Sequence, residues 1–211
     1  FSINKYSSEG VAAHGELLYG SDPAYYMNVL RHAGTGPVTV TEALPSWTDF
    51  VIDIPVGNIT AYLKAYRSYL DAKTKLDKYE YTLSRQKKEH GISAEEWAKS
   101  LDIKEVALAD IHFESKLRHV ILIKPGVKHP ENAVKDFGAT AGFLKTLFGG
   151  IFTGEGETSA TFVNGWIVAG EDDVIRKYAN TLGETLADRL ASNVSGDRVP
   201  QKGCGFWGYH S

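Results

Sequence analysis

The feature that most constrains this fold is a long apolar stripe of helical period between Asn58 and Gly91. Asn is a preferred helix N-cap, and Gly commonly ends a helix in the left-handed conformation. The spacing therefore predicts one helix from 58 to about 90, about 50 Å long at 1.5 Å per residue, with one buried face. The apolar positions are spaced mainly by threes and fours: Ile59, Tyr62, Leu63, Tyr66, Tyr69, Leu70, Leu76, Tyr79 and Leu83.

Capping signals predict further helices on either side of this one. Ser21-Asp22-Pro23 places a cap and a first-turn proline before a helix that Gly34 ends. Ser93 and Glu96 have the spacing of a capping box. In this motif the Ser hydroxyl accepts a hydrogen bond from a backbone amide of the first turn, and the Glu side chain accepts one from the backbone amide of the Ser. That box predicts a short helix to about residue 100. Segments 136–148 and 172–190 also have helical character.

The segments between the predicted helices have strand character. The mainly polar segment 114–117 separates two apolar runs, which predicts a β-hairpin. Hairpins with helices between them predict an α+β fold, an antiparallel sheet with helices packed mainly on one face, as one domain over 1–211. The predicted strands are 37–42, 48–55, 103–113, 118–124, 158–169 and 205–209.

Three strand-to-helix junctions share a glycine followed by a small polar residue, at 18–22, 55–58 and 168–172. Two interpretations stay open. The chain contains a duplicated α+β unit, or the similarity reflects the general chemistry of such turns, where Gly permits the bend and the polar side chain caps free amides.

Composition and charge exclude some classes of function. The chain has 23 basic and 26 acidic residues and no basic block, which argues against a dedicated nucleic-acid binder. The one cysteine, Cys204, excludes an internal disulfide. Phe1 is not a start Met, and an aromatic, strand-like run stops abruptly at the other end. We therefore expect a trimmed segment of a longer chain.

One pair of histidines is a candidate metal site. If 114–117 is the hairpin turn, His112 pairs with His119 on one face, about 5 Å apart, with Asp110 two residues along. Two imidazoles and a carboxylate can hold zinc with one position open. The alternative is a pair of exposed hairpin-end histidines without a ligand, because a one-residue change of register separates them.

Other conspicuous clusters have structural explanations. The acidic run 171–173 lies where a helix begins, and anions are favoured there by the helix dipole. The glycine-rich run 149–156 lacks the Lys-Ser/Thr of a phosphate loop, so no cofactor is predicted. The apolar run 143–152 is a core helix or a surface for a membrane or partner groove. Tyr62, Tyr66 and Tyr69 form an aromatic stripe suited to core packing or to stacking on sugars.

Four parts of the chain share a pattern with a known family: residues 50–55, the Tyr-rich helix after them, 91–93 with 101–107, and 197–207. Together these segments resemble an uncharacterised family of bacterial exported proteins that carry a large domain of unknown function and often a lipoprotein anchor. It implies an extracytoplasmic location, periplasmic or at the cell surface. It implies no activity, cofactor or site residue.

These observations lead to one expectation with two alternatives. We expect a non-catalytic interaction or ligand-binding module outside the cytoplasm. Its partner is a protein or small ligand, and any peripheral membrane attachment lies outside this segment. The first alternative is a hydrolase or metal-dependent enzyme that uses Asp110, His112 and His119. The second is a membrane-surface module that uses 143–152.

Overall fold

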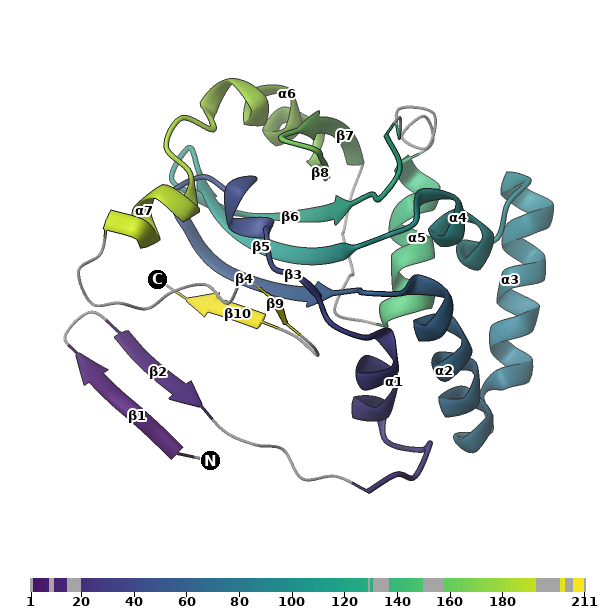
Figure 1. Cartoon of the computed structure of the whole chain (residues 1–211). Helices are drawn as coiled ribbons and strands as arrows, with labels where there is room; N and C mark the ends of the chain where they lie inside the picture. The colour runs from purple at the N-terminus through teal and green to yellow at the C-terminus, as the bar shows by residue number, and fades with distance from the viewer. Residues whose placement is uncertain are drawn as a thin grey trace.

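The computed structural model describes residues 2–7, 10–14, 20–128, 130, 137–149, 158–192, 202–203 and 207–210. Its centre is a six-stranded sheet in which all neighbouring strands are antiparallel, in the order β10-β4-β5-β6-β8-β7 (Figure 1). The α+β prediction is therefore confirmed. The strands are β4 (Thr48–Pro55), β5 (Glu105–Phe113), β6 (Lys116–Lys124), β7 (Thr158–Val163), β8 (Trp166–Glu171) and β10 (Trp207–His210).

The central hairpin β5–β6 sets the register of the sheet. Its turn is the two-residue pair Glu114-Ser115, and both residues have positive φ, 49° and 64°. Turns of this kind match the right-handed twist of the flanking strands. The predicted turn 114–117 was therefore too long. Phe113 pairs with Lys116 and not with Arg118, a register shift of two residues.

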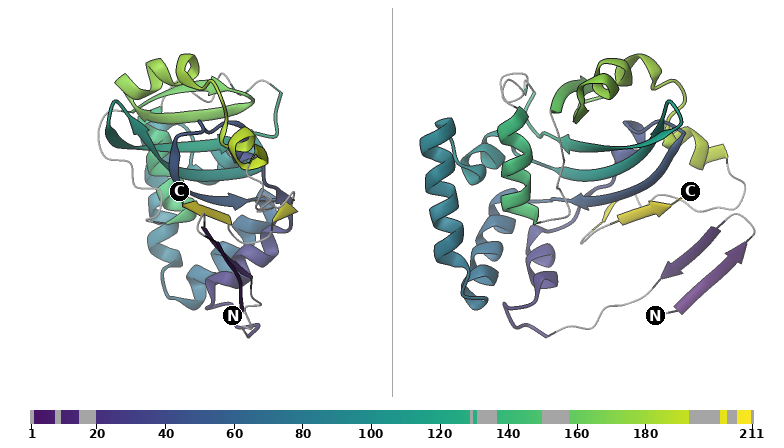
Figure 2. Two further views of the ribbon diagram at one scale, coloured as in Figure 1. Left: turned by 90° about the vertical axis from the view of Figure 1, so that its left-hand side faces the viewer. Right: turned by 180° about the vertical axis from the view of Figure 1, so that it is seen from behind.

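Five helices cover one face of the sheet at the end away from the β5–β6 turn (Figures 1 and 2). Their buried residues share one core with Ile54, Val106, Ile121 and Ile123 of the strands. Helices mainly on one face were predicted, and this layer confirms it. The helices are α1 (Tyr26–Ala33), α2 (Ile59–Ala72), α3 (Leu76–His90), α4 (Ala94–Leu101) and α5 (Phe137–Phe148).

The predicted helix from 58 to 90 is two helices, α2 and α3. The chain reverses at Thr74, which has a positive φ of 53°. Tyr66 of α2 then meets Tyr79 of α3 edge-on, with ring centroids 5.6 Å apart. The apolar stripe is buried as predicted, but it folds back on itself. Residues 71–75 contain no large apolar side chain, so a straight helix would bury nothing there.

A smaller layer covers the opposite face of the sheet. It consists of a 3₁₀ turn, η1 (Val40–Glu42), with α6 (Asp172–Thr181) and α7 (Leu186–Ser192). Residues 37–42 were predicted as a strand, but the only strand there is β3 (Gly36–Pro37), and η1 follows it. The helix predicted over 172–190 is two helices, α6 and α7, with a break between them. Tyr178 of α6 donates a hydrogen bond to the Ala43 carbonyl at 2.6 Å, which fastens α6 to the η1 segment.

The segment 158–169, predicted as one strand, is a hairpin. Asn164 and Gly165, both with positive φ, turn β7 into β8. Asn-Gly is the strongest short hairpin signal, and the continuous apolar character of the segment concealed it. β3 pairs with β9 (Lys202–Gly203), and β1 (Ser2–Ser7) pairs with β2 (Gly10–His14), a hairpin that the sequence analysis did not predict.

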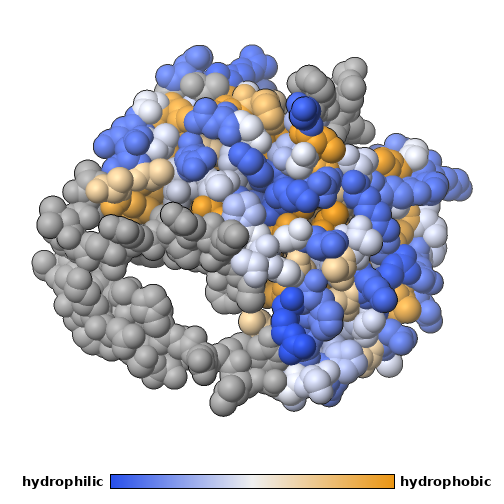
Figure 3. Space-filling model, viewed as in Figure 1, coloured by the Kyte–Doolittle hydropathy of each residue, from blue (hydrophilic) through white to orange (hydrophobic). Residues whose placement is uncertain are grey.

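The polar faces of the helices point outward. From the side of Figure 1, the surface is mostly hydrophilic with scattered hydrophobic residues (Figure 3). Among the described residues, no helix is both long and apolar enough to span a bilayer. The capping box at Ser93 and Glu96 is formed as predicted.

Two leucines of β6 test the burial pattern. We expect Leu122→Ala to lower the free energy of unfolding by about 2–5 kcal/mol, because Leu122 is fully buried and the substitution leaves a cavity. Leu117→Ala in the same strand is the matched control. Leu117 is 50% exposed, so its loss should change stability by less than about 0.5 kcal/mol in chemical denaturation. Equal effects would contradict the described core.

Candidate functional site

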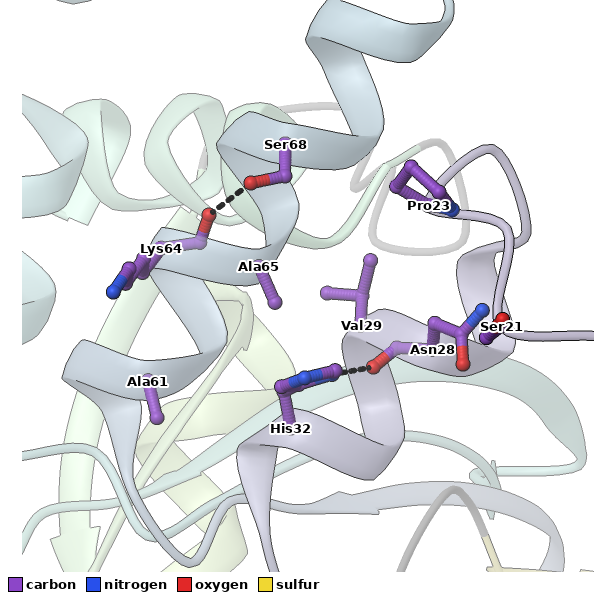
Figure 4. Close-up of a pocket in the computed structure, with 9 residues that line it drawn as sticks. All are labelled: Ser21, Pro23, Asn28, Val29, His32, Ala61, Lys64, Ala65 and Ser68. Carbon is purple, nitrogen blue, oxygen red and sulfur yellow. Dashed lines mark hydrogen bonds between the residues drawn. The ribbon is translucent and has the colours of Figure 1, made fainter.

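The strongest candidate site is a groove between α1 and α2, with a volume of about 500 Å³ (Figure 4). That volume is in the range of small-ligand pockets. Apolar side chains from both helices form much of its lining, and polar atoms lie around them. The nine lining residues are Ser21, Pro23, Asn28, Val29, His32, Ala61, Lys64, Ala65 and Ser68.

Small residues on α2 leave space for this groove. Ala61 and Ala65 are four residues apart, so they lie on the same face of the helix, toward α1. Ser21 and Pro23 contribute from the segment before α1. Buried Asn28 holds that segment, because its amide donates to the carbonyls of Gly20 at 3.0 Å and Asp22 at 2.7 Å.

Among the residues that the structure describes, the ionisable groups lining the groove are basic, His32 and Lys64. Lys64 makes no ion pair with the residues that the structure describes. His32 Nδ1 donates to the Asn28 carbonyl at 2.6 Å, since a carbonyl can only accept. His32 Nε2 has no hydrogen-bond partner in the described part of the chain, so it is available to a ligand. No acidic side chain lines the groove among the described residues. Its chemistry therefore suits an apolar molecule with an anionic group.

The predicted metal-site residues lie on the exposed end of the sheet, near the β5–β6 turn. His119 pairs with Asp110 through Nδ1, and His112 pairs with Asp49 through Nε2 at 2.6 Å. Asp110 is directly opposite His119, and His112 is opposite Leu117. The two histidines share a face, as predicted, but the expected direct pairing was wrong because the turn is shorter.

These two pairs do not form the expected three-residue zinc site. Among the residues that the structure describes, no group of three or more His, Cys, Asp or Glu side chains could hold a metal ion. Each imidazole has its own carboxylate, and both histidines are more than half exposed. Each pair fixes the tautomer of one ring, which is useful for proton transfer only if a substrate is held nearby.

A buried acid pair lies on the opposite face of the sheet. Glu105 accepts hydrogen bonds from Thr39 N at 2.6 Å, Thr39 Oγ1 at 2.7 Å and Val40 N at 3.1 Å, and so anchors η1 to β5. Asp53 is also fully buried, and neither of its oxygens has a hydrogen-bond partner among the described residues. Burial, followed by the charge of Glu105, raises the pKa of Asp53 to about 9.

Burial also raises the pKa of Glu105, against the hydrogen bonds from Thr39 and Val40 that favour its charged form. Asp53 is therefore the member that stays protonated at neutral pH. This acid pair was not predicted from the sequence. A charged residue in the apolar run 50–55 was the available signal.

The other sequence-predicted clusters have structural roles where the structure describes them. Glu171 and Asp173 flank the first residue of α6, and Arg118 pairs with both, which neutralises the acidic run. The apolar run from Phe143 to Phe148 is buried in the helical core, as are Tyr62 and Tyr66. Cys204 and most of 149–156 lie outside the described residues.

The chain matches no known family model, no curated protein and no solved structure. The groove was not predicted from the sequence, because its lining comes from residues of two helices and a preceding turn that meet only in the folded chain. The Ala61–Ala65 spacing was its one local signal.

The buried acid pair predicts an unusual pH dependence. Unfolded Asp53 ionises near 3.8, whereas the folded group ionises near 9. Between these values the folded state binds the extra proton, so this group makes stability fall as pH rises, by at most about 1.4 kcal/mol per pH unit. We expect Asp53→Asn to raise the unfolding midpoint at pH 8 by several degrees, on the order of 1 kcal/mol or more.

Thermal unfolding from pH 5 to pH 9 measures this effect. The difference between Asp53→Asn and the parent protein should grow as pH rises, because only the parent loses a proton on unfolding. Asp77→Asn, at an exposed position, is the matched control and should follow the parent curve. A constant difference between Asp53→Asn and the parent would show that Asp53 is ionised in the folded protein.

Proposed function

We propose that this protein is a non-catalytic binding module whose α1–α2 groove takes a small molecule with an apolar body and an anionic group. The observation that carries the proposal is the groove itself. Its volume is about 500 Å³, its apolar lining includes Val29, Ala61 and Ala65, and the ionisable residues among its described lining are His32 and Lys64.

The electrostatics of the groove favour anions over cations. A carboxylate or sulfonate can pair with the Lys64 ammonium and accept from a protonated His32 at Nε2. The apolar body of the ligand would cover Val29 and the two alanines, which contributes about 25 cal/mol per Å² of apolar surface removed from water. A cationic amphiphile would bury the same area but face Lys64.

We further propose that the module works outside the cytoplasm. The resemblance to exported bacterial proteins supports this location, and a single cysteine is compatible with it. Fractionation of cells that express the full-length gene tests the location. Recovery with cytoplasmic markers would contradict it and would leave the groove proposal unaffected.

A fluorescent apolar anion tests the groove. We expect 8-anilinonaphthalene-1-sulfonate to bind saturably at one site. Lys64→Met should weaken the affinity for this dye about tenfold, because it removes one charge-assisted contact of about 1.4 kcal/mol, which corresponds to a factor of ten. Ala65→Phe should abolish binding by filling the groove. Lys88→Met, on exposed α3 and outside the groove, is the matched control and should bind like the parent.

Competition separates this site from general adsorption of the dye. Dodecanoate should displace the probe from the parent protein, whereas dodecyltrimethylammonium, with the same chain and the opposite charge, should not. Equal displacement by both amphiphiles, or equal dye affinity in all variants, would refute the proposed site.

A further inference from the structure

The strand β7 has an open edge. It is the last strand of the six-stranded sheet and pairs with β8 on one side only. The turn, loop and cap hydrogen bonds between described backbone groups do not involve 158–163. The outward N–H and C=O groups of β7 are therefore available to another strand, in the part of the chain that the structure describes.

Within its own six residues, β7 carries none of the local devices that prevent strand pairing. Natural edge strands carry lysine or other charges, proline or a β-bulge, which block the approach of a second strand. β7 reads Thr-Ser-Ala-Thr-Phe-Val, without a charge or a proline. Its six pairs with β8 run from Thr158 to Val163 without a register shift, so no bulge turns the edge away.

The side chains of β7 are incompletely covered. Phe162 is 46% exposed, so a large apolar side chain of this strand faces water. Ala160, two residues away on the same face, is half-buried against the helical core. Thr161 lies on the opposite face and is also half-buried. A second strand beside β7 would cover Phe162.

We propose that β7 pairs with β7 of a second copy of this chain, antiparallel about a two-fold axis at Thr161. A two-fold axis normal to the sheet keeps each residue on its own face, so Ala160 of one copy lies opposite Phe162 of the other. Thr161 faces Thr161, and Thr–Thr is a favourable cross-strand pair. The sheets of the two copies become one continuous sheet.

Self-pairing fits this strand better than pairing with a charged peptide. The strand is uncharged, so two copies bring no like charges together, and the small Ala160 leaves space for the large Phe162 at the same level. The contact is limited to one strand edge, which is below the size of a stable interface. The dimer is therefore weak and depends on protein concentration.

Cross-linking at the axis tests the pairing. In a Cys204→Ser background, Thr161→Cys places two thiols opposite each other, about 5 Å apart between Cβ atoms. A short bismaleimide should convert most of this variant to a covalent dimer within minutes at high protein concentration. Ser84→Cys, on exposed α3, is the matched control for random collision and should stay at least about tenfold less cross-linked.

A second variant separates pairing from chance reactivity. Phe162→Lys in the Thr161→Cys background puts a charge on each edge and should remove the cross-link. Position 162 is partly exposed, so this variant should still fold, and its thermal unfolding checks that it does. Sedimentation of the parent protein should show a concentration-dependent dimer that Phe162→Lys abolishes. A parent protein that stays monomeric at millimolar concentration would overturn the proposal. So would a cross-link through the thiol at position 161 that persists when Phe162→Lys is added.

Discussion

The fold depends on the two-residue turn at Glu114-Ser115. The turn fixes nine residue pairs between β5 and β6, the central strands of the sheet. Strand side chains alternate between faces, so this register decides which residues join which core. Val106, Ile121 and Ile123 face the five-helix layer, whereas Ala107, Ala109 and Leu122 face η1, α6 and α7. A one-residue slip would exchange both sets at once.

The same register separates the polar groups of the sheet into two environments. Asp110 and His119 lie opposite each other in the half of the β5–β6 hairpin nearer the turn, where both side chains are partly exposed to water. Asp53 and Glu105 lie on the other face, at the opposite end of the strands, under η1. Carboxylates of the same sheet are therefore paired and partly exposed at one end, and buried at the other, where Asp53 holds a proton. The extent of burial, and not the residue type, decides whether each carboxyl group is charged.

The proposed functions use parts of the molecule that the hydrophobic cores leave free. The α1–α2 groove exists because alanines, and not larger residues, face α1 along α2. The open edge of β7 exists because the sheet ends there while helices cover its faces. α6 and α5 both pack against β7, yet neither gives its backbone a partner among the described residues. A binding groove and a strand edge can thus operate independently in one chain.

Local signals in the sequence predicted much of the fold but little of the candidate site. The capping pair Ser93 and Glu96 produced a helix with the expected box, and 48–55 is a strand with the predicted bounds. Errors arose where a local signal allowed two interpretations. The apolar stripe of 59–83 suits one long helix or two packed helices, and only the contact of Tyr66 with Tyr79 decides between them. In 158–169, uniform apolar character concealed the Asn164-Gly165 turn. His112, His119 and Asp110 were expected to converge, but a turn shorter by two residues gave each histidine a separate carboxylate. Periodicity and capping act within a few residues, so the amino-acid order alone specified most of the helices and strands and many of their buried faces. The groove, the buried acid pair and the strand edge emerged only when distant segments packed together, because each depends on which segments meet and on how much water they exclude.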